Sequence, residues 1–134
     1  MARNPKPLRK KAKRYKRLRL SKKEMRKRTI RKDEYDLISC LLSQISEHSR
    51  KYIIPEIIQE MDDGGMGSIK LSGGKANRVL IERQYLDSDG QLVLITLYDN
   101  DQQELFELDM WKVDFSPLVK YPVSTELKAA IESK

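Results

Sequence analysis

The chain is poor in the residues on which many catalytic and metal sites depend. Its 134 residues include one cysteine, one histidine and one tryptophan. The single Cys40 excludes a disulfide within the chain and favours a reducing compartment, so we expect a cytoplasmic protein. A helix would hold Cys40 and His48 about 12 Å apart along its axis, which excludes a Cys–His dyad on one helix. We therefore expect no metal, no cofactor and no enzymatic activity.

Long hydrophobic runs are also missing. No apolar stretch approaches the roughly 20 residues that span a bilayer, and the charges at the N-terminus are not followed by the apolar region of a secretory signal. We expect no membrane span. The composition, 39% hydrophobic and 35% charged, is that of a polar but globular chain.

Charge is present in abundance and is unevenly distributed. Residues 1–32 contain 17 Lys or Arg and one acid, a net charge of +16, whereas residues 33–134 contain 10 basic and 19 acidic residues, a net charge of −9. Such asymmetry indicates the partners of a protein and carries no information about its fold. It predicts a cationic arm attached to an anionic body.

The arm covers residues 1–28 and is too highly charged and too poor in apolar residues to fold alone. A thin stripe at spacings of three, four and seven residues predicts that it becomes helical when a polyanion neutralises it. The stripe consists of Leu8, Ala12, Tyr15, Leu18, Lys22 and Met25.

Dense Lys and Arg residues suit a nucleic-acid backbone, because they release the counterions condensed on its phosphates. We expect a non-enzymatic binding protein that contacts RNA, DNA or a ribonucleoprotein through this arm. The candidate nucleic-acid-binding residues are Arg9, Lys10, Lys11, Lys13, Arg14, Tyr15, Lys16, Arg17, Arg19, Lys22, Lys23, Arg26 and Lys27.

Other interpretations of the charges remain open. Besides nucleic-acid binding, which the composition favours, the arm is compatible with a solvated tail, with docking onto the acidic body of the same chain, or with attraction to an anionic membrane. The alternative function is a protein-interaction module whose acidic body caps a basic partner, as toxin-immunity proteins do, since opposite charge speeds association.

The remaining sequence predicts an α+β fold, a four- or five-stranded antiparallel meander with a helix packed on one face. One apolar stripe predicts a helix over 31–47, and Asp-, Asn- and Gly-rich turns separate the expected strands. The strands are expected at 57–61, 69–71, 79–86, 92–98 and 105–113. A second helix is expected at 124–133, and residues 29–134 are expected to form a single domain.

Three acidic or glycine-rich stretches invite chemical interpretations that their spacing does not favour. The turn at 62–68 lacks the pattern of a phosphate-binding loop, and its glycines fit a tight turn. The turn at 87–90 lacks the distant glutamate of a calcium loop and fits a hairpin. Glu107 and Asp109 share a strand face with Trp111, while Lys112 and Asp114 fall on the other face, so ion pairs are favoured over a metal site.

These same stretches carry a resemblance. Asp62-Asp-Gly-Gly-Met-Gly-Ser68, Asp87-Ser-Asp-Gly90 and Glu107-Leu-Asp-Met-Trp-Lys-Val-Asp-Phe-Ser-Pro-Leu118 resemble the DGGMGS, DxDG and ELDxWKVDFSPL motifs of a family of small bacterial proteins with a domain of unknown function. The resemblance covers roughly residues 28–122 and implies where the folded domain lies. It implies no activity, and the basic arm lies outside it.

Overall fold

The computed structural model describes residues 26–45 and 52–130. The chain forms an α+β fold with one α-helix and a seven-stranded antiparallel sheet in these ranges. The strands are β1 (Lys27–Thr29), β2 (Ile57–Glu60), β3 (Ile69–Lys70), β4 (Ala76–Leu86), β5 (Leu92–Asn100), β6 (Leu105–Lys112) and β7 (Lys128–Ala129).

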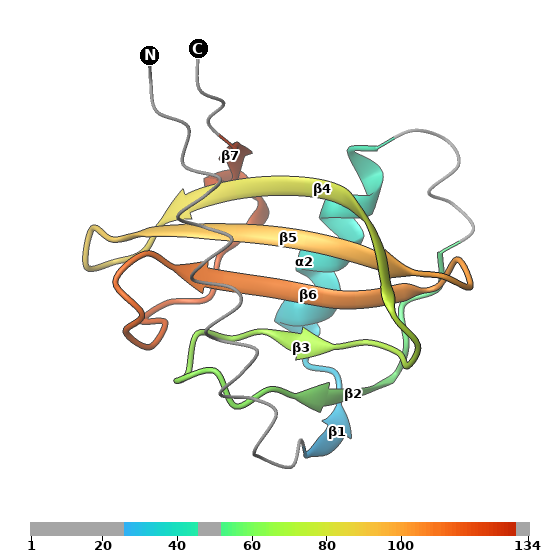
Figure 1. The fold of residues 1–134 in the computed structure, drawn as a ribbon. Coiled ribbons are helices and arrows are strands. Elements are labelled where there is room, and N and C mark those ends of the chain that lie inside the picture. Colours follow the sequence, from blue (N-terminus) through green and yellow to red (C-terminus); the bar gives the residue numbers. More distant parts are fainter. Residues whose placement is uncertain (1–25, 46–51, 131–134) are drawn as a thin grey trace.

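The sheet order is β1-β2-β3-β6-β5-β4-β7 (Figure 1). Two runs of consecutive antiparallel strands, β1-β2-β3 and β4-β5-β6, are joined because β3 pairs with β6 and not with β4. The expected four- or five-stranded meander is therefore wrong in strand number and order. The antiparallel pairing and the five expected strands are confirmed with shifted ends.

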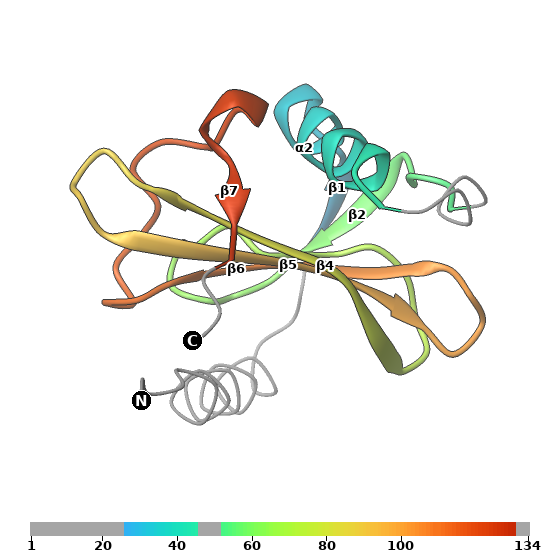
Figure 2. The ribbon, with the colours of Figure 1, turned by 90° about the horizontal axis from the view of Figure 1, so that it is seen from above.

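The helix α2 (Lys32–Ser43) packs on one face of the sheet, as expected (Figure 2). Glu34 occupies the third helical position, and its Oε1 accepts a hydrogen bond of 2.9 Å from the backbone N–H of Arg31, which precedes the helix. This contact satisfies a backbone donor at the helix start, where intrahelical acceptors are missing. The helix ends several residues before the expected position, and residues 46–47 lie outside the described ranges.

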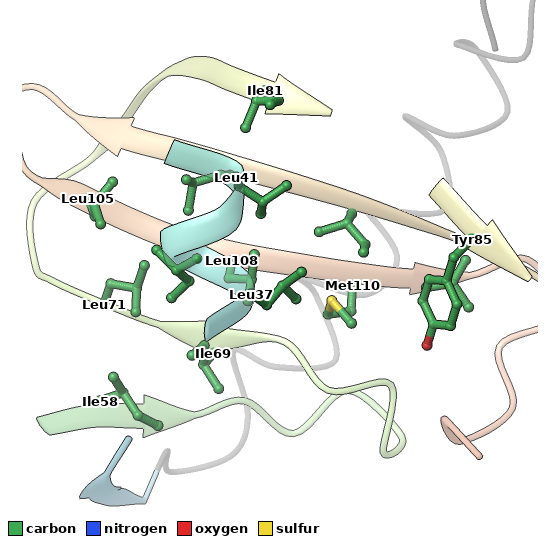
Figure 3. Close-up of a cluster of buried hydrophobic side chains, with 14 residues drawn as sticks. Leu37, Leu41, Ile58, Ile69, Leu71, Ile81, Tyr85, Leu105, Leu108 and Met110 are labelled. Carbon is green, nitrogen blue, oxygen red and sulfur yellow. The ribbon is translucent and has the colours of Figure 1, made fainter. Parts of the chain in front are cut away.

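The main core lies between α2 and the sheet, because the apolar side of the helix meets every second residue of the central strands (Figure 3). Leu37 and Leu41 of α2 face Leu108 of β6, and all three are at most 2% exposed. A smaller cluster around Met66 and Trp111 is separate from this core. Burial of the tryptophan segment at the centre of the sheet is as the sequence predicts.

The C-terminal part differs from the expected helix. Ser124–Glu126 forms a single 3-10 turn, and Lys128–Ala129 continues as β7, paired with Gln84 and Arg83 of β4. The helical spacing of Leu127 and Ala130 did not decide the structure, because an open sheet edge at β4 offers backbone hydrogen bonds to an extended chain. The prediction of a helix over 124–133 is wrong for the described residues 124–130.

Leu108→Ala tests the position of the core. Leu108 has no exposed surface, so the variant should lose about 2–5 kcal/mol of unfolding free energy. Leu86→Ala is the matched control, since Leu86 is 63% exposed and its loss should change stability by about 0.5 kcal/mol or less. Urea unfolding measures both, and equal midpoints for the two variants would contradict this core.

Candidate functional site

The glycine-rich turn is built around the side chain of Asp63. Its two carboxylate oxygens accept hydrogen bonds of 3.1 Å from the backbone N–H groups of Met66 and Ser68. Gly64, Gly65 and Gly67 all have positive φ, which glycine adopts without steric cost. The expected role of these glycines in a tight turn is confirmed, and the carboxylate occupies the donors that a phosphate would need.

This turn is fastened to the segment that follows β6. The backbone N–H of Leu118 donates to the carbonyl of Gly65 at 2.9 Å, and that of Lys112 donates to the sulfur of Met66 at 3.3 Å. A Cβ placed on Gly65 would lie 3.1 Å from the Cβ of Pro117. The turn and the tryptophan segment are thus in direct contact through backbone and side chain.

Lys112 joins the third motif to the other two. Its side chain is fully buried, and Nζ donates to Asp87 at 2.9 Å, to Asp89 at 2.6 Å and to the carbonyl of Pro117 at 3.0 Å. An ammonium has three N–H groups, so its donors are saturated. Burial alone would lower the pKa of Lys112, but the two carboxylates raise it, and the side chain stays charged.

Asp87 is the other half of this buried ion pair. Besides Lys112, its carboxylate accepts backbone N–H bonds from Ser88, Val119 and Lys120. Burial by itself raises the pKa of Asp87, yet these donors together lower it to about 2. The hairpin turn expected at 87–90 is confirmed, with Gly90 at φ 82°. We name residues 63–68, 87–90 and 110–118 the motif junction.

The motif junction has the properties of a structural element. Its ammonium and carboxylates are satisfied by one another and by the backbone, which leaves no vacant position for a reacting group. The expectation of an ion pair at Lys112 is confirmed, whereas Asp114 is exposed and accepts from Ser116. No group of three or more His, Cys, Asp or Glu side chains in the described ranges is arranged to hold a metal ion.

The face of the sheet that points away from α2 carries a different set of side chains. Residues directly opposite one another in antiparallel strands share a face, so the register of β4, β5 and β6 defines three rows there. The rows are Val79–Tyr98–Glu107, Glu82–Thr96–Asp109 and Gln84–Leu94–Trp111. We name these nine residues the carboxylate face.

The nine residues of the carboxylate face include three acids and no base, and the row of Glu107 continues to a basic residue, Lys70 of β3, which lies directly opposite it. Glu107 and Asp109 are only 2% exposed, although they lie on the opposite face from the helix. Glu82 accepts from the hydroxyl of Thr96 at 3.1 Å, and Asp109 accepts from that of Ser68 at 3.4 Å. The expected common face of Glu107, Asp109 and Trp111 is confirmed. Glu82 was not predicted to join them, because only the cross-strand register brings it there.

Arg26 and Lys27 are the two predicted nucleic-acid-binding residues within the described ranges; the other eleven lie outside them. Arg26 donates to Glu60 at 3.0 Å, and Lys27 lies in β1 opposite Gln59. The sheet thus begins inside the range predicted as arm. The next residue, Arg28, holds Glu34 of α2 and Glu60 of β2 at 2.8 and 2.7 Å, which fixes β1 to both.

Two further features, a surface hollow and a buried aspartate, lie outside the motif junction and the carboxylate face. An open hollow of about 470 Å³ lies between α2 and residues 122–124, and its lining includes Asp33, Asp36 and Cys40 without a convergent set of polar groups. Asp99 is buried and accepts from Tyr52 and Arg78, which ties the start of β4 to the chain before β2. Neither arrangement presents a reactive group to a ligand.

The fold and the motif junction define a small α+β domain in which three turn motifs interlock at one end of an antiparallel sheet. Residues 27–122 match the family described as Domain of unknown function (DUF6984), and the chain belongs to this family. The resemblance seen in the motifs is thereby confirmed. Neither the curated proteins nor the solved structures provide a match. No helix in the described part of the chain is long and apolar enough to cross a membrane.

Asp87→Asn tests the buried ion pair. The variant leaves a buried ammonium without its main countercharge and should lose about 3–5 kcal/mol of stability. Asp89→Asn is the control, because its carboxylate is partly exposed and its loss should cost about 1 kcal/mol or less. The folded pKa of Asp87 is lowered, so its contribution is complete above about pH 4 and disappears as the pH falls toward 2. Denaturant unfolding across this window should show a steeper acid loss for wild type than for Asp87→Asn, and parallel curves would contradict the pairing.

Gly65→Ala tests the contact between the glycine turn and Pro117. The positive φ and the 3.1 Å approach should together cost about 1–3 kcal/mol. Gly73→Ala is the matched control, since a Cβ there meets nothing within 4 Å and the backbone has no positive φ. Its stability should stay within about 1 kcal/mol of wild type. Thermal unfolding compares the two, and a Gly65→Ala protein as stable as the control would exclude a tight junction.

Proposed function

We propose that the protein is a non-enzymatic binding protein that contacts nucleic acid or a ribonucleoprotein through residues 3–28. The observation that carries the proposal is the placement of 17 of the 27 Lys and Arg residues in the first 32 positions. Polyanion affinity in proteins comes largely from such clustered cations, through the release of condensed counterions. The acidic remainder of the chain would repel the same ligand, which confines binding to the basic segment.

The ion pairs of the body support this assignment. Nine Lys and Arg residues of the described ranges lie after residue 28, and five of them are held by carboxylates of the same chain. These five are Arg31, Lys32, Arg78, Lys112 and Lys120. A phosphate would have to compete with an intramolecular carboxylate at each of them, so the body is a poor second binding surface.

Phosphate contacts position a nucleic acid without reading its sequence. The proposed mode is accordingly an electrostatic one, with low sequence preference. Tyr15 is the aromatic residue of this segment and lies near the centre of its charge cluster. Stacking of Tyr15 on a base would add to the affinity for single-stranded nucleic acid.

A second candidate function is favoured by the carboxylate face. Three acids grouped on one sheet face, with Lys70 of β3 opposite Glu107 at the edge of the group, suit a cationic partner protein. The two functions separate by mutation. Neutralising the basic segment should abolish polyanion binding and spare capture of a basic partner. Glu82→Gln, Glu107→Gln and Asp109→Asn together should abolish capture of the basic partner and spare polyanion binding.

The salt dependence of binding tests the proposal. Full-length protein should bind an oligothymidylate with an affinity that falls steeply with salt. Replacing Lys10, Lys13, Arg14 and Arg17 by Gln should weaken binding and reduce the slope of log affinity against log salt by roughly 3, since each lost phosphate contact contributes about 0.7–0.9. Fluorescence anisotropy at several salt concentrations measures both quantities, and circular dichroism should show helix gained with ligand.

The control removes the same charge from the body. Lys32, Lys75, Lys120 and Lys128 are exposed, and their replacement by Gln gives an equal change of net charge. This variant should keep most of the affinity and the slope of wild type. Equal losses in the two quadruple variants would assign binding to net charge alone and would overturn the role of the basic segment.

A further inference from the structure

The carboxylate face combines two properties that rarely occur together on a sheet face. Glu107 and Asp109 are as buried as the core leucines, and no element described on this side of the sheet corresponds to α2 on the other (Figure 2). Burying a carboxylate costs several kcal/mol unless cations or hydrogen-bond donors compensate it. The face therefore has the chemistry of a surface that a cationic element covers.

Trp111 gives an independent indication. Its side chain is 5% exposed and lies in the third row of the same face, beside Leu94 and Gln84. The buried indole Nε1 has no hydrogen-bond partner in the described structure. Buried indole N–H groups normally find an acceptor, so this face presents an unsatisfied donor as well as its acids. Both features indicate a polar ligand with apolar contacts.

We propose that the carboxylate face is the docking surface for the basic segment of the same chain, residues 1–25. This segment contains 12 Lys or Arg and a single acid, Glu24, which makes it the charge complement of a face with three acids, beside which Lys70 of β3 lies opposite Glu107. Its apolar residues, among them Leu18 and Met25, provide partners for Leu94 and Trp111.

The distances allow this docking without rearrangement of the sheet. The segment ends at residue 25, shortly before Lys27 of β1. Lys27 lies at the edge of the cross-strand row that contains Glu107, and the full row is Lys27, Gln59, Lys70, Glu107 and Tyr98. From β1 to β4 there are five strand spacings, about 24 Å at about 4.8 Å each. A helix from Leu8 to Met25 is about 27 Å long and spans the face.

Docking has a regulatory consequence, and this part of the inference rests on the proposed function. The Lys and Arg residues that pair with buried carboxylates cannot contact phosphates at the same time, so the docked state excludes polyanion binding. A polyanion then binds only the undocked fraction of molecules, and its apparent affinity falls in proportion to that fraction. The acidic face acts as an internal competitor of the nucleic acid.

Acrylamide quenching of Trp111 in the full-length protein tests the docking directly, because Trp111 is the single tryptophan. Lys10→Glu, Arg14→Glu and Arg17→Glu together leave the folded domain untouched and should release the segment. The Stern–Volmer slope should then rise about twofold or more as a buried indole becomes accessible. The matched control, Lys32→Glu with Lys75→Glu and Lys128→Glu, should leave Trp111 as protected as in wild type.

Two results would overturn the docking. If the segment variant protects Trp111 as well as wild type does, the face is covered by something other than residues 1–25. If protection in wild type weakens on dilution, the occupant is a second copy of the chain, and the intramolecular contact is excluded. High salt should also raise quenching in wild type, since it screens the ion pairs.

The competition is tested on the face itself. Glu82→Gln, Glu107→Gln and Asp109→Asn together should tighten binding of an oligothymidylate about tenfold if about nine in ten molecules are docked. Asp36→Asn, Glu56→Gln and Asp101→Asn form the control, with the same change of net charge at exposed positions outside the face. Equal tightening in both variants would reduce the effect to net charge and exclude competition.

Failure of the proposed function would look different. Wild type would then bind no oligothymidylate at any salt concentration, while the segment variant would still expose Trp111. Conversely, salt-dependent binding with unchanged quenching in the segment variant would retain the nucleic-acid function and remove the docking. The two readouts therefore separate the docked surface from the function on which its regulation depends.

Discussion

A lysine ammonium with no exposed surface holds one end of the sheet together. Because a buried ammonium must pair all its N–H groups, Lys112 fixes the hairpin turn at Asp87 and Asp89 against the chain at Pro117. Asp87 extends this constraint through the backbone of Val119 and Lys120. Pro117 in turn packs against Gly65. Three turns that are far apart in the sequence are thereby placed by one charge.

The two faces of the sheet differ in their chemistry. The face under α2 is apolar and supplies the main core, with Leu97 and Leu108 opposite one another and fully buried. The other face exchanges these leucines for carboxylates, hydroxyls and an indole at neighbouring positions of the same strands. Alternation along a strand makes this possible, since successive side chains point to opposite faces. An acidic face is thus built on the same strands that form the apolar core.

Local patterns predicted local structure well, and long-range pairing escaped them. The hairpin turns at 87–90 and 100–104 and the apolar side of α2 follow from nearby residues, so the central strands were predicted nearly in full. β1 was hidden inside a run of basic residues, because Arg28 becomes part of the fold through long-range contacts, its ion pairs with Glu34 and Glu60 and the pairing of β1 with β2. The pairing of β3 with β6 and of β7 with β4 depends on backbone edges that no sequence pattern marks. For the same reason, the two-residue alternation within β6 predicted a common face for Glu107, Asp109 and Trp111, but Glu82 of β4 was not predicted to join them.

The short outer strands bear on how readily the sheet of this protein pairs with another chain at high concentration. An exposed strand edge is a template on which further chains can assemble into fibres or aggregates. Here the sheet ends in β1, three residues with the sequence Lys-Arg-Thr, and in β7, the two residues Lys-Ala. Each of these outermost strands is brief and carries a lysine whose desolvation would oppose an intruding strand. Because β7 pairs only with Arg83 and Gln84, most of the longer β4 still forms the edge on that side of the sheet.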